Sequence, residues 1–281
     1  MKKLSLVCLL LAGNLKIWAQ GTAACCHQDA TTEFAQLGSR EDFRMAHDNP
    51  LPYTYQGTAG TAITFSTPDG QEGHGFMFKA THPSDKYLYV IHEWYGLNDF
   101  VKKESEKLFN DLGKQVNVIA VDLYDQRVAT NREDASKIMQ SVKTERASSI
   151  IKGAFAYAPP HAKIATLGWC FGGGWSLQAA MMAGTKGVAC VMYYGMPEKE
   201  VSALKALHAP VLGIFANKDK FITPQVVEEF KVHMQEAGKS LMVKQYDADH
   251  GFANPSNPIY DSHATKEAYS HAITFLKQYL K

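Results

Sequence analysis

Cysteine is scarce in this chain, and its few cysteines do not form the pattern of a disulfide-stabilised protein. The five cysteines among 281 residues are Cys8, Cys25, Cys26, Cys170 and Cys190. The adjacent pair, Cys25 and Cys26, is unsuited to an internal bridge, because disulfide geometry strains the peptide between neighbours. Three alternatives stay open for this pair: bonding to another chain, binding a metal together with His27, or remaining free.

An excess of charge of one sign is also absent. Lys and Arg number 29 and Asp and Glu number 28, with no long block of either sign. We therefore expect no nucleic-acid partner, which would require a surface that neutralises phosphates. No apolar run reaches the about 20 residues of a membrane-spanning helix, and no internal repeat indicates a solenoid or propeller. With 46% hydrophobic residues, the composition is that of a folded globular protein.

The first twenty residues have the pattern of a secretory signal peptide. Lys2 and Lys3 precede a short apolar run over residues 4–12, and residues 17–19 offer a cleavage site before Gln20. We expect residues 1–19 to be removed and the protein to be exported, either to a periplasm or out of the cell. Cys25 follows two alanines, so lipid anchoring stays open as an alternative. For the first twenty residues, an ordinary amphipathic helix is the alternative to a signal peptide.

The rest of the chain predicts an N-terminal extension over residues 20–56 and one α/β domain over residues 57–281. β-Branched and aromatic runs at 61–66 and 75–80 flank a Pro-Asp-Gly turn and predict an antiparallel hairpin. Apolar strands then alternate with helical segments, which is typical of a mainly parallel sheet flanked by helices. The further strands are expected at 87–92, 116–121, 164–168, 187–194, 211–216 and 241–246, and the helices at 99–112, 132–154, 173–183, 224–237 and 264–280.

The segment GWCFGG at 168–173 carries the strongest chemical signal. It lies between a predicted strand and a predicted helix, as a G-x-S-x-G nucleophile elbow does, with Cys170 in place of serine. Small residues must flank the nucleophile in such a tight turn. The N–H groups that begin the following helix favour a thiolate and an oxyanion. The competing interpretation is a glycine-rich turn that holds an idle cysteine.

Two later residues weaken that competing interpretation. Asp219 follows the predicted strand at 211–216, and His250 follows the predicted strand at 241–246. The order nucleophile, acid, histidine is the order found in α/β-hydrolases. Both residues come just after the carboxyl ends of strands, where open α/β sheets build their sites. Either residue alone would be weak evidence for a catalytic site, and the evidence comes from the order of all three residues.

A further carboxylate follows the predicted strand at 87–92. Glu93 begins a turn that ends in Gly96, at the edge of the sheet where the elbow is expected. The loop after this strand can supply an oxyanion-binding N–H group. Unaided, the sequence favours an ordinary surface position for Glu93.

The chain at this point resembles the dienelactone hydrolase family, which has the α/β-hydrolase fold and a Cys-His-Asp triad. The matching segments are HEWYGLND (92–99), DLY (122–124), GWCFGG (168–173), NKDKFITP (217–224) and DHGFANP (249–255). The resemblance implies that Cys170 is the nucleophile, His250 the base and Asp219 the carboxylate that orients it. It also implies that Glu93 contacts the resting thiol. The family's oxyanion-binding N–H groups correspond to those of Trp94 and Phe171.

Two positions depart from the family's pattern. Members that cleave dienelactone carry an arginine four residues after the histidine, where this chain has Asn254, and another two residues after the DLY motif. Gln126 takes that second place, with Arg127 one residue later. Tyr124, Arg127 and Asn254 are the expected substrate-binding residues. The departures leave dienelactone itself open as a substrate and retain ester or lactone hydrolysis.

The sequence thus predicts a monomeric hydrolase of small carboxylic esters or lactones that works through a thioester. It is expected to need no metal or organic cofactor. Other acyl-bond hydrolases, such as a thioesterase or a sugar-ester esterase, remain as alternatives. A non-catalytic binding protein on the same fold is another, and a metal- or thiol-handling protein that uses Cys25, Cys26 and His27 is a third.

Overall fold

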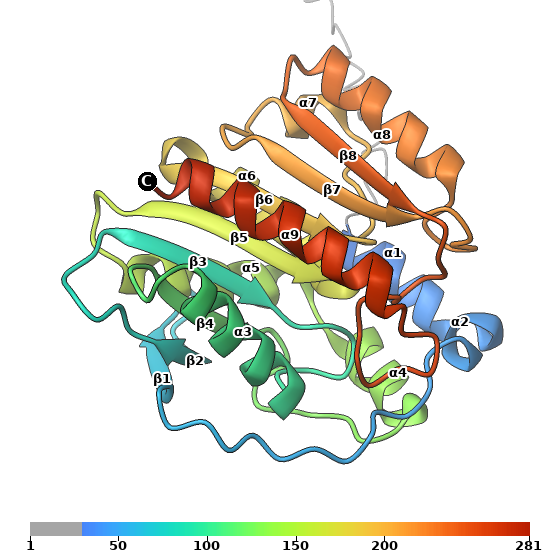
Figure 1. Cartoon of the computed structure of the whole chain (residues 1–281), viewed down its shortest axis with the longest axis horizontal. Coiled ribbons are helices and arrows are strands. Elements are labelled where there is room, and N and C mark those ends of the chain that lie inside the picture. The colour runs from blue at the N-terminus through green and yellow to red at the C-terminus, as the bar shows by residue number, and fades with distance from the viewer. Residues whose placement is uncertain (1–29) are drawn as a thin grey trace, which may run out of the picture.

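The computed structural model describes residues 30–281 and is organised around one eight-stranded sheet (Figure 1). The strand order is β1-β2-β4-β3-β5-β6-β7-β8. β1 and β2 form an antiparallel hairpin, β2 joins β4 antiparallel, and every other pairing is parallel. The strands are β1 (Thr61–Ser66), β2 (Glu72–Phe78), β3 (Lys86–Ile91), β4 (Asn117–Asp122), β5 (Lys163–Trp169), β6 (Gly187–Tyr193), β7 (Val211–Ala216) and β8 (Leu241–Tyr246). The mainly parallel sheet and the N-terminal hairpin are confirmed. The expected signal peptide and the Cys25–Cys26 pair lie outside the described residues.

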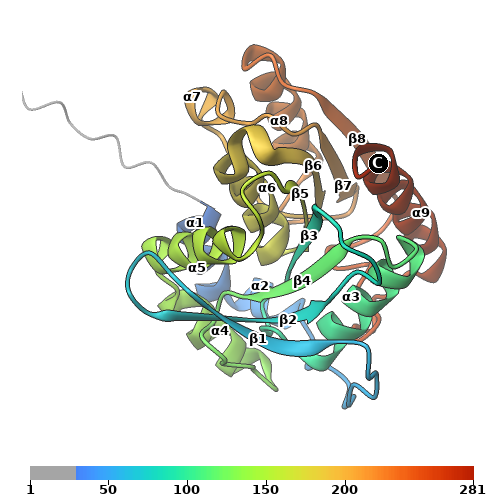
Figure 2. The ribbon, with the colours of Figure 1, turned by 90° about the vertical axis from the view of Figure 1, so that its left-hand side faces the viewer.

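Helices cover both faces of the sheet (Figure 2), with α3 and α9 on one face and α5 and α6 on the other. The helices are α1 (Ala30–Ser39), α2 (Glu41–Met45), α3 (Asp99–Asp111), α4 (Arg132–Ser141), α5 (Thr144–Tyr157), α6 (Phe171–Ala183), α7 (Val201–Leu204), α8 (Pro224–Glu236) and α9 (Ser262–Tyr279), with a 3₁₀ turn at Gly184–Lys186. All residues of β4 and β7 are buried. Strands covered on both faces need continuous apolar runs, which is why their sequences predicted them well.

The prediction of one helix over residues 132–154 was wrong, because the structure has two helices there, α4 and α5. Val142 and Lys143 between α4 and α5 have extended backbone, with ψ of 130° and 132°. The break buries the Val142 side chain and lets α4 pack on α1 while α5 packs on the hairpin. Neither proline nor glycine marks this position, so helical spacing alone did not reveal the break.

The segment that precedes the hairpin packs against the domain. α1 contacts α4 and α6, and α1 and α2 lie at the carboxyl ends of the central strands (Figure 1). Phe34 and Phe43 are fully buried. The Phe34 ring meets the Phe171 ring edge-on, with 6.0 Å between centroids. This segment therefore contributes apolar contacts next to the expected elbow.

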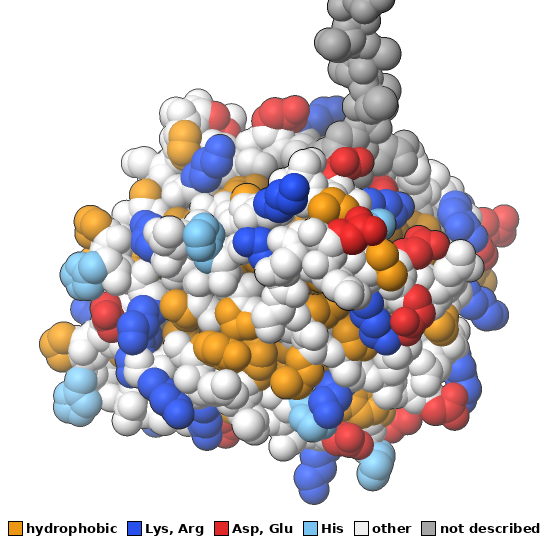
Figure 3. Space-filling view, turned by 90° about the horizontal axis from the view of Figure 1, so that it is seen from above, with side chains coloured by type: hydrophobic (Ala, Val, Ile, Leu, Met, Phe, Trp, Pro, Cys, Tyr) orange, Lys and Arg blue, Asp and Glu red, His pale blue; other side chains and the backbone are white. Residues whose placement is uncertain are grey.

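The surface bears both signs of charge. On the face shown in Figure 3, basic and acidic side chains are interspersed around a band of hydrophobic side chains. This mixing agrees with the nearly balanced charge of the sequence. Among the described residues, no helix has both the length and the apolar character needed to cross a membrane.

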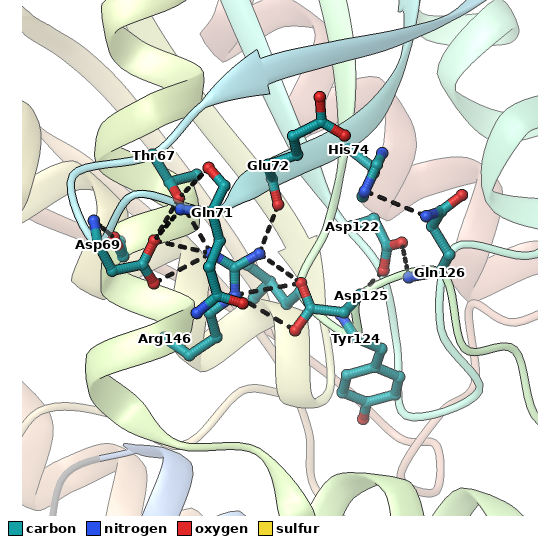
Figure 4. A network of polar contacts seen from close by, with 12 residues as sticks. Thr67, Asp69, Gln71, Glu72, His74, Asp122, Tyr124, Asp125, Gln126 and Arg146 are labelled. Atoms are coloured by element: carbon teal, nitrogen blue, oxygen red, sulfur yellow. Dashed lines mark hydrogen bonds and ion pairs between the residues drawn. The ribbon is translucent and has the colours of Figure 1, made fainter.

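Arg146 on α5 ties the hairpin to the loop that follows β4 (Figure 4). Its guanidinium donates to the Asp125 carboxylate at 2.6 Å, to the Asp69 carboxylate at 3.0 Å and to the Glu72 carbonyl at 2.6 Å. The planar fork of arginine suits such divided contacts. Since this loop also carries Tyr124, the network fixes the position of an expected substrate-binding residue.

We expect Arg146→Ala to lower the free energy of unfolding by about 1.5–3 kcal/mol, because hydrogen bonds to charged partners contribute about that much. Arg146→Lys restores charge without the fork and should recover only part of the loss. Thermal unfolding measures both effects. Lys152→Ala, at an exposed position of the same helix, is the matched control and should change stability by less than about 0.5 kcal/mol. Equal effects of Arg146→Ala and the control would contradict the prediction.

Candidate active site

Cys170 lies in a strained turn between β5 and α6. Its φ of 54° and ψ of −117° fall outside the regions that L-residues ordinarily occupy. The Cys170 N–H donates to the Tyr193 carbonyl at 3.0 Å. A Cβ atom at Gly172 would lie 2.3 Å from the Ile91 carbonyl, and one at Gly168 would lie 2.0 Å from the Gly172 carbonyl. Side chains are thus excluded on both sides, and the turn has the geometry of a nucleophile elbow.

The structure brings Cys170, His250 and Asp219 into one line of contacts. His250 Nε2 lies 3.3 Å from Cys170 Sγ, and His250 Nδ1 lies 2.6 Å from Asp219 Oδ2. The other oxygen of Asp219 accepts from the N–H groups of Phe221 and Ile222 at 2.8 and 2.9 Å. Asp219 is thereby fixed, and it holds the imidazole with Nε2 toward the sulfur.

The electrostatics of these three groups favour transfer of a proton from sulfur to histidine. Burial raises the pKa of the Cys170 thiol above its usual value, although the nearby His250 opposes this. Burial alone would lower the pKa of His250, but the charges of Asp219 and Cys170 raise it well above the usual range. Burial likewise opposes the ionisation of Asp219, whose pKa is held low by His250 and its donors. The charges of Asp219 and Cys170 thus stabilise a protonated His250, which is the state that follows removal of the thiol proton.

Glu93 lies beside this line, two residues after the end of β3. Its Oε2 accepts from the Asn254 amide at 2.6 Å, and its Oε1 accepts from the Tyr194 hydroxyl at 3.4 Å. Burial raises the pKa of Glu93 to about 7, although the Asn254 contact opposes this. Its charge in turn contributes to the raised pKa of Cys170. Asn254 therefore binds an acidic side chain of the protein.

A buried histidine fixes the backbone that carries Glu93. His92 Nδ1 donates to the Glu93 carbonyl at 2.6 Å, and His92 Nε2 accepts from the Leu123 N–H at 3.0 Å. The loops that follow β3 and β4 are thus joined. The side chains that these loops present to the site depend on each other for their positions.

The remaining predicted residues take different places. The Phe171 N–H donates to the Cys170 sulfur, which favours the thiolate. Trp94 is fully buried at the turn after β3. Tyr124 is also buried, and within the described chain its hydroxyl has no hydrogen-bond partner. Arg127 donates to the Tyr124 carbonyl at 2.8 Å and to Ser141 Oγ at 2.8 Å. Its guanidinium therefore supports the loop that carries Tyr124.

A pocket opens next to Glu93 and Asn254. Its wall includes Trp169 and Phe100, a second carboxylate, Glu104, and no lysine or arginine. Burial raises the pKa of Glu104 as well. The lining of this pocket is therefore neutral when Glu93 and Glu104 are protonated and negatively charged when they are not.

His47 was not singled out in the sequence, yet it reaches the nucleophile from the N-terminal segment. Its Nε2 lies 3.9 Å from Cys170 Sγ, and its Nδ1 donates to the Phe43 carbonyl at 2.7 Å. The ring stands 4.7 Å from the Trp94 ring. Burial, aided by the charge of His250, lowers the pKa of His47 to about 3, so the ring is neutral. The apolar spacing of Phe34, Phe43 and their neighbours was the available signal that this segment packs on the domain.

Fold and elbow together define an α/β-hydrolase. The sequence pattern of the dienelactone hydrolase family matches residues 74–280, and the chain belongs to that family. It is similar to carboxymethylenebutenolidase 1 of Cupriavidus pinatubonensis, with 26% identity over 77% of this chain and 95% of the relative. It is also similar to protein usf of Aquifex pyrophilus, with 27% identity over 68% and 87% of the two chains.

Solved structures share the fold. A dienelactone hydrolase-like promiscuous phosphotriesterase from metagenomic libraries superposes with a TM-score of 0.67 and 20% identity, over 79% of this chain and 99% of that one. The α/β-hydrolase fold predicted from the sequence is confirmed. Family membership places the chain among enzymes that hydrolyse ester and lactone bonds.

We expect Glu93→Gln to raise the rate at which iodoacetamide alkylates Cys170. The Glu93 carboxylate disfavours a nearby thiolate, and the variant removes that charge. Because the pKa of Glu93 is about 7, the ratio of variant to wild-type rates should rise as the pH increases from 6 to 8. Mass-resolved alkylation of the Cys170 peptide measures both rates. Glu104→Gln is the matched control, and a rate ratio that does not change with pH would contradict this role.

Proposed function

We propose that this chain hydrolyses esters or lactones through a Cys170–His250–Asp219 triad and a thioester intermediate. His250 takes the thiol proton as sulfur attacks the substrate carbonyl, and then gives that proton to the departing alkoxide. A water molecule, deprotonated by His250, next attacks the thioester and releases the acid and the thiol. From a lactone, the alcohol and acid remain in one ring-opened molecule. The chemistry needs no metal or organic cofactor.

The observation that carries this proposal is the unbroken line of contacts from Asp219 through His250 to a cysteine in an elbow. A base must lie within hydrogen-bond reach of the proton that it removes, and His250 Nε2 is 3.3 Å from Cys170 Sγ. The basic character of His250 supports its role as acceptor. We assign oxyanion binding to the N–H groups of Phe171 and Trp94, since the first opens helix α6 beside the sulfur.

The surroundings favour a neutral substrate with a polar group. Burying a hydroxyl without a partner is costly, and the Tyr124 hydroxyl is such a group. We propose that it hydrogen-bonds to bound substrate. Asn254 is engaged by Glu93, and Arg127 by the Tyr124 carbonyl and Ser141. Asn254 carries no charge, and the Arg127 guanidinium is directed to these two groups of the protein. Similarity to a carboxymethylenebutenolidase supports lactones among the substrates.

We also propose that the protein acts after export, on the pattern of residues 1–19. The mass of the mature protein recovered from its host tests this proposal. A chain that begins at Gln20 would support export, and a chain that retains the first nineteen residues would overturn it.

Cys170→Ala should abolish turnover of a chromogenic short-chain ester and leave folding intact. Loss of a triad nucleophile typically costs on the order of 10⁴-fold or more in rate. Cys170→Ser should fold but turn over slowly, because a hydroxyl is less easily deprotonated than a thiol. The matched control is Cys190→Ala, which alters the other buried cysteine of the described chain. Full activity of Cys170→Ala would overturn the proposed function.

Anionic lactones should be preferred only weakly over neutral ones. A charge-assisted contact to a substrate carboxylate is worth about 1.5–3 kcal/mol, and Asn254 supplies none. The measurement is kcat/KM for a carboxylated lactone and for its methyl ester. A preference for the anion above about a hundredfold, or some 2.7 kcal/mol, would contradict the prediction. Arg127→Ala would then show whether that guanidinium holds the carboxylate.

A further inference from the structure

The proposed hydrolysis uses one imidazole at the sulfur, but the structure places two there. Cys170 Sγ lies 3.3 Å from His250 Nε2 and 3.9 Å from His47 Nε2. The three atoms all lie within 4.8 Å of one another, and all three side chains are buried. The His47 and His250 rings meet edge-on, with 5.3 Å between centroids. Two nitrogens and one sulfur thus converge on a single point from separate elements.

Hydrogen bonds at the far side of each ring direct its lone pair to that point. His47 Nδ1 donates to the Phe43 carbonyl at 2.7 Å. His250 Nδ1 is bound to Asp219 Oδ2 at 2.6 Å. The other nitrogen of each ring, Nε2, carries the lone pair once it holds no proton. Carbonyl or carboxylate partners of this kind are what hold metal-binding histidines in position.

The two sulfur–nitrogen distances are close to those around a tetrahedral metal ion. Zinc binds thiolate sulfur at about 2.3 Å and imidazole nitrogen at about 2.0–2.1 Å, which separates the two kinds of donor by about 3.6 Å in a tetrahedron. The observed sulfur–nitrogen distances of 3.3 and 3.9 Å lie on either side of that value. Thiolate with two imidazoles is a donor set that favours zinc over magnesium or calcium.

We propose that His47, Cys170 and His250 form a binding site for Zn²⁺ or a divalent cation of similar softness. On binding, a metal–sulfur bond forms, the thiol proton passes to solvent and a water molecule completes the coordination. No change of oxidation state is involved. The donors are buried, and the Phe43 ring packs against His47 and His250, with 4.2 and 6.1 Å between ring centroids.

Such an ion would act as a reversible inhibitor. It would occupy the sulfur and the Nε2 of the base together, and it would join the N-terminal segment to the elbow. The binding site rests on the geometry of three side chains, and only its effect on turnover rests on the proposed function. The two claims are therefore separable by experiment.

Metal binding is measured directly on the full chain. Cys8, Cys25 and Cys26 are first replaced by serine, so that the adjacent pair near His27 cannot contribute a thiolate. Calorimetry with Zn²⁺ gives the stoichiometry and affinity, and Co²⁺ gives a thiolate charge-transfer absorption. We expect one equivalent of Zn²⁺ and a cobalt–thiolate band that Cys170→Ala removes. Cys190→Ala, the matched control, should retain both.

Variants of His47 distinguish a metal site of three donors from binding of zinc by Cys170 and His250 alone. His47→Phe keeps an aromatic ring but removes the nitrogen that would bind the metal. His47→Gln replaces it in the experiment if His47→Phe does not fold. Either should weaken zinc binding at least tenfold, since loss of a mere supporting contact already costs about 10–100-fold. Unchanged affinity in a folded His47 variant, or the absence of a one-to-one complex, would overturn the proposal.

Ester turnover in the same samples separates the two claims. One equivalent of Zn²⁺ should suppress turnover, and a chelator should restore it. A one-to-one complex that needs His47 and Cys170, in an enzyme whose turnover does not need Cys170, would overturn the proposed function and still support the metal site.

Discussion

The strained backbone of Cys170 is the constraint on which the geometry of the site depends. An L-residue held in such a conformation costs on the order of 1–3 kcal/mol and persists only where its surroundings enforce it. Here the enforcement comes from the Tyr193 carbonyl and from backbone packed against Gly168 and Gly172. The parallel register places Gly168 opposite Ile91 of β3 and Trp169 opposite Tyr193 of β6. Glu93 and Tyr194, which come after those strands, therefore lie at the same edge of the sheet as Cys170, and their charges and that of the sulfur influence each other.

Much of this arrangement could be predicted from the sequence because its causes are local. Cys170 directly follows β5, and Asp219 and His250 lie within four residues of the ends of β7 and β8. The carboxyl ends of parallel strands lie on the same edge of the sheet. The order of Cys170, Asp219 and His250 then limited the fold to very few alternatives. The break between α4 and α5 has no such local cause. Nothing in the sequence at Val142 opposes a helix, and the burial of its side chain is seen only in the folded chain.

The contacts missed in the sequence join residues that are far apart along the chain. His47 reaches Cys170 across 123 positions, and Asn254 reaches Glu93 across 161. Spacing rules act within one helix or strand, so they cannot pair His47, just beyond a five-residue helix, with a distant turn. Asn254 could be recognised only as a departure from the family's arginine. Its partner, Glu93, became evident only from the folded chain.

That pairing changes what the buried carboxylate can do. An arginine beside Glu93 would favour its ionised form and lower its pKa. Asn254 is neutral and opposes the effect of burial only in part, so the pKa of Glu93 stays near 7. The carboxyl group is then partly protonated at neutral pH, and its repulsion of the Cys170 thiolate is correspondingly weaker. Asn254 thus adds no cation to the pocket beside Glu93, and it leaves Glu93 with only part of a negative charge near the nucleophile. Such a site suits uncharged esters, because it offers no added cation to a substrate carboxylate and leaves His250 to stabilise the thiolate.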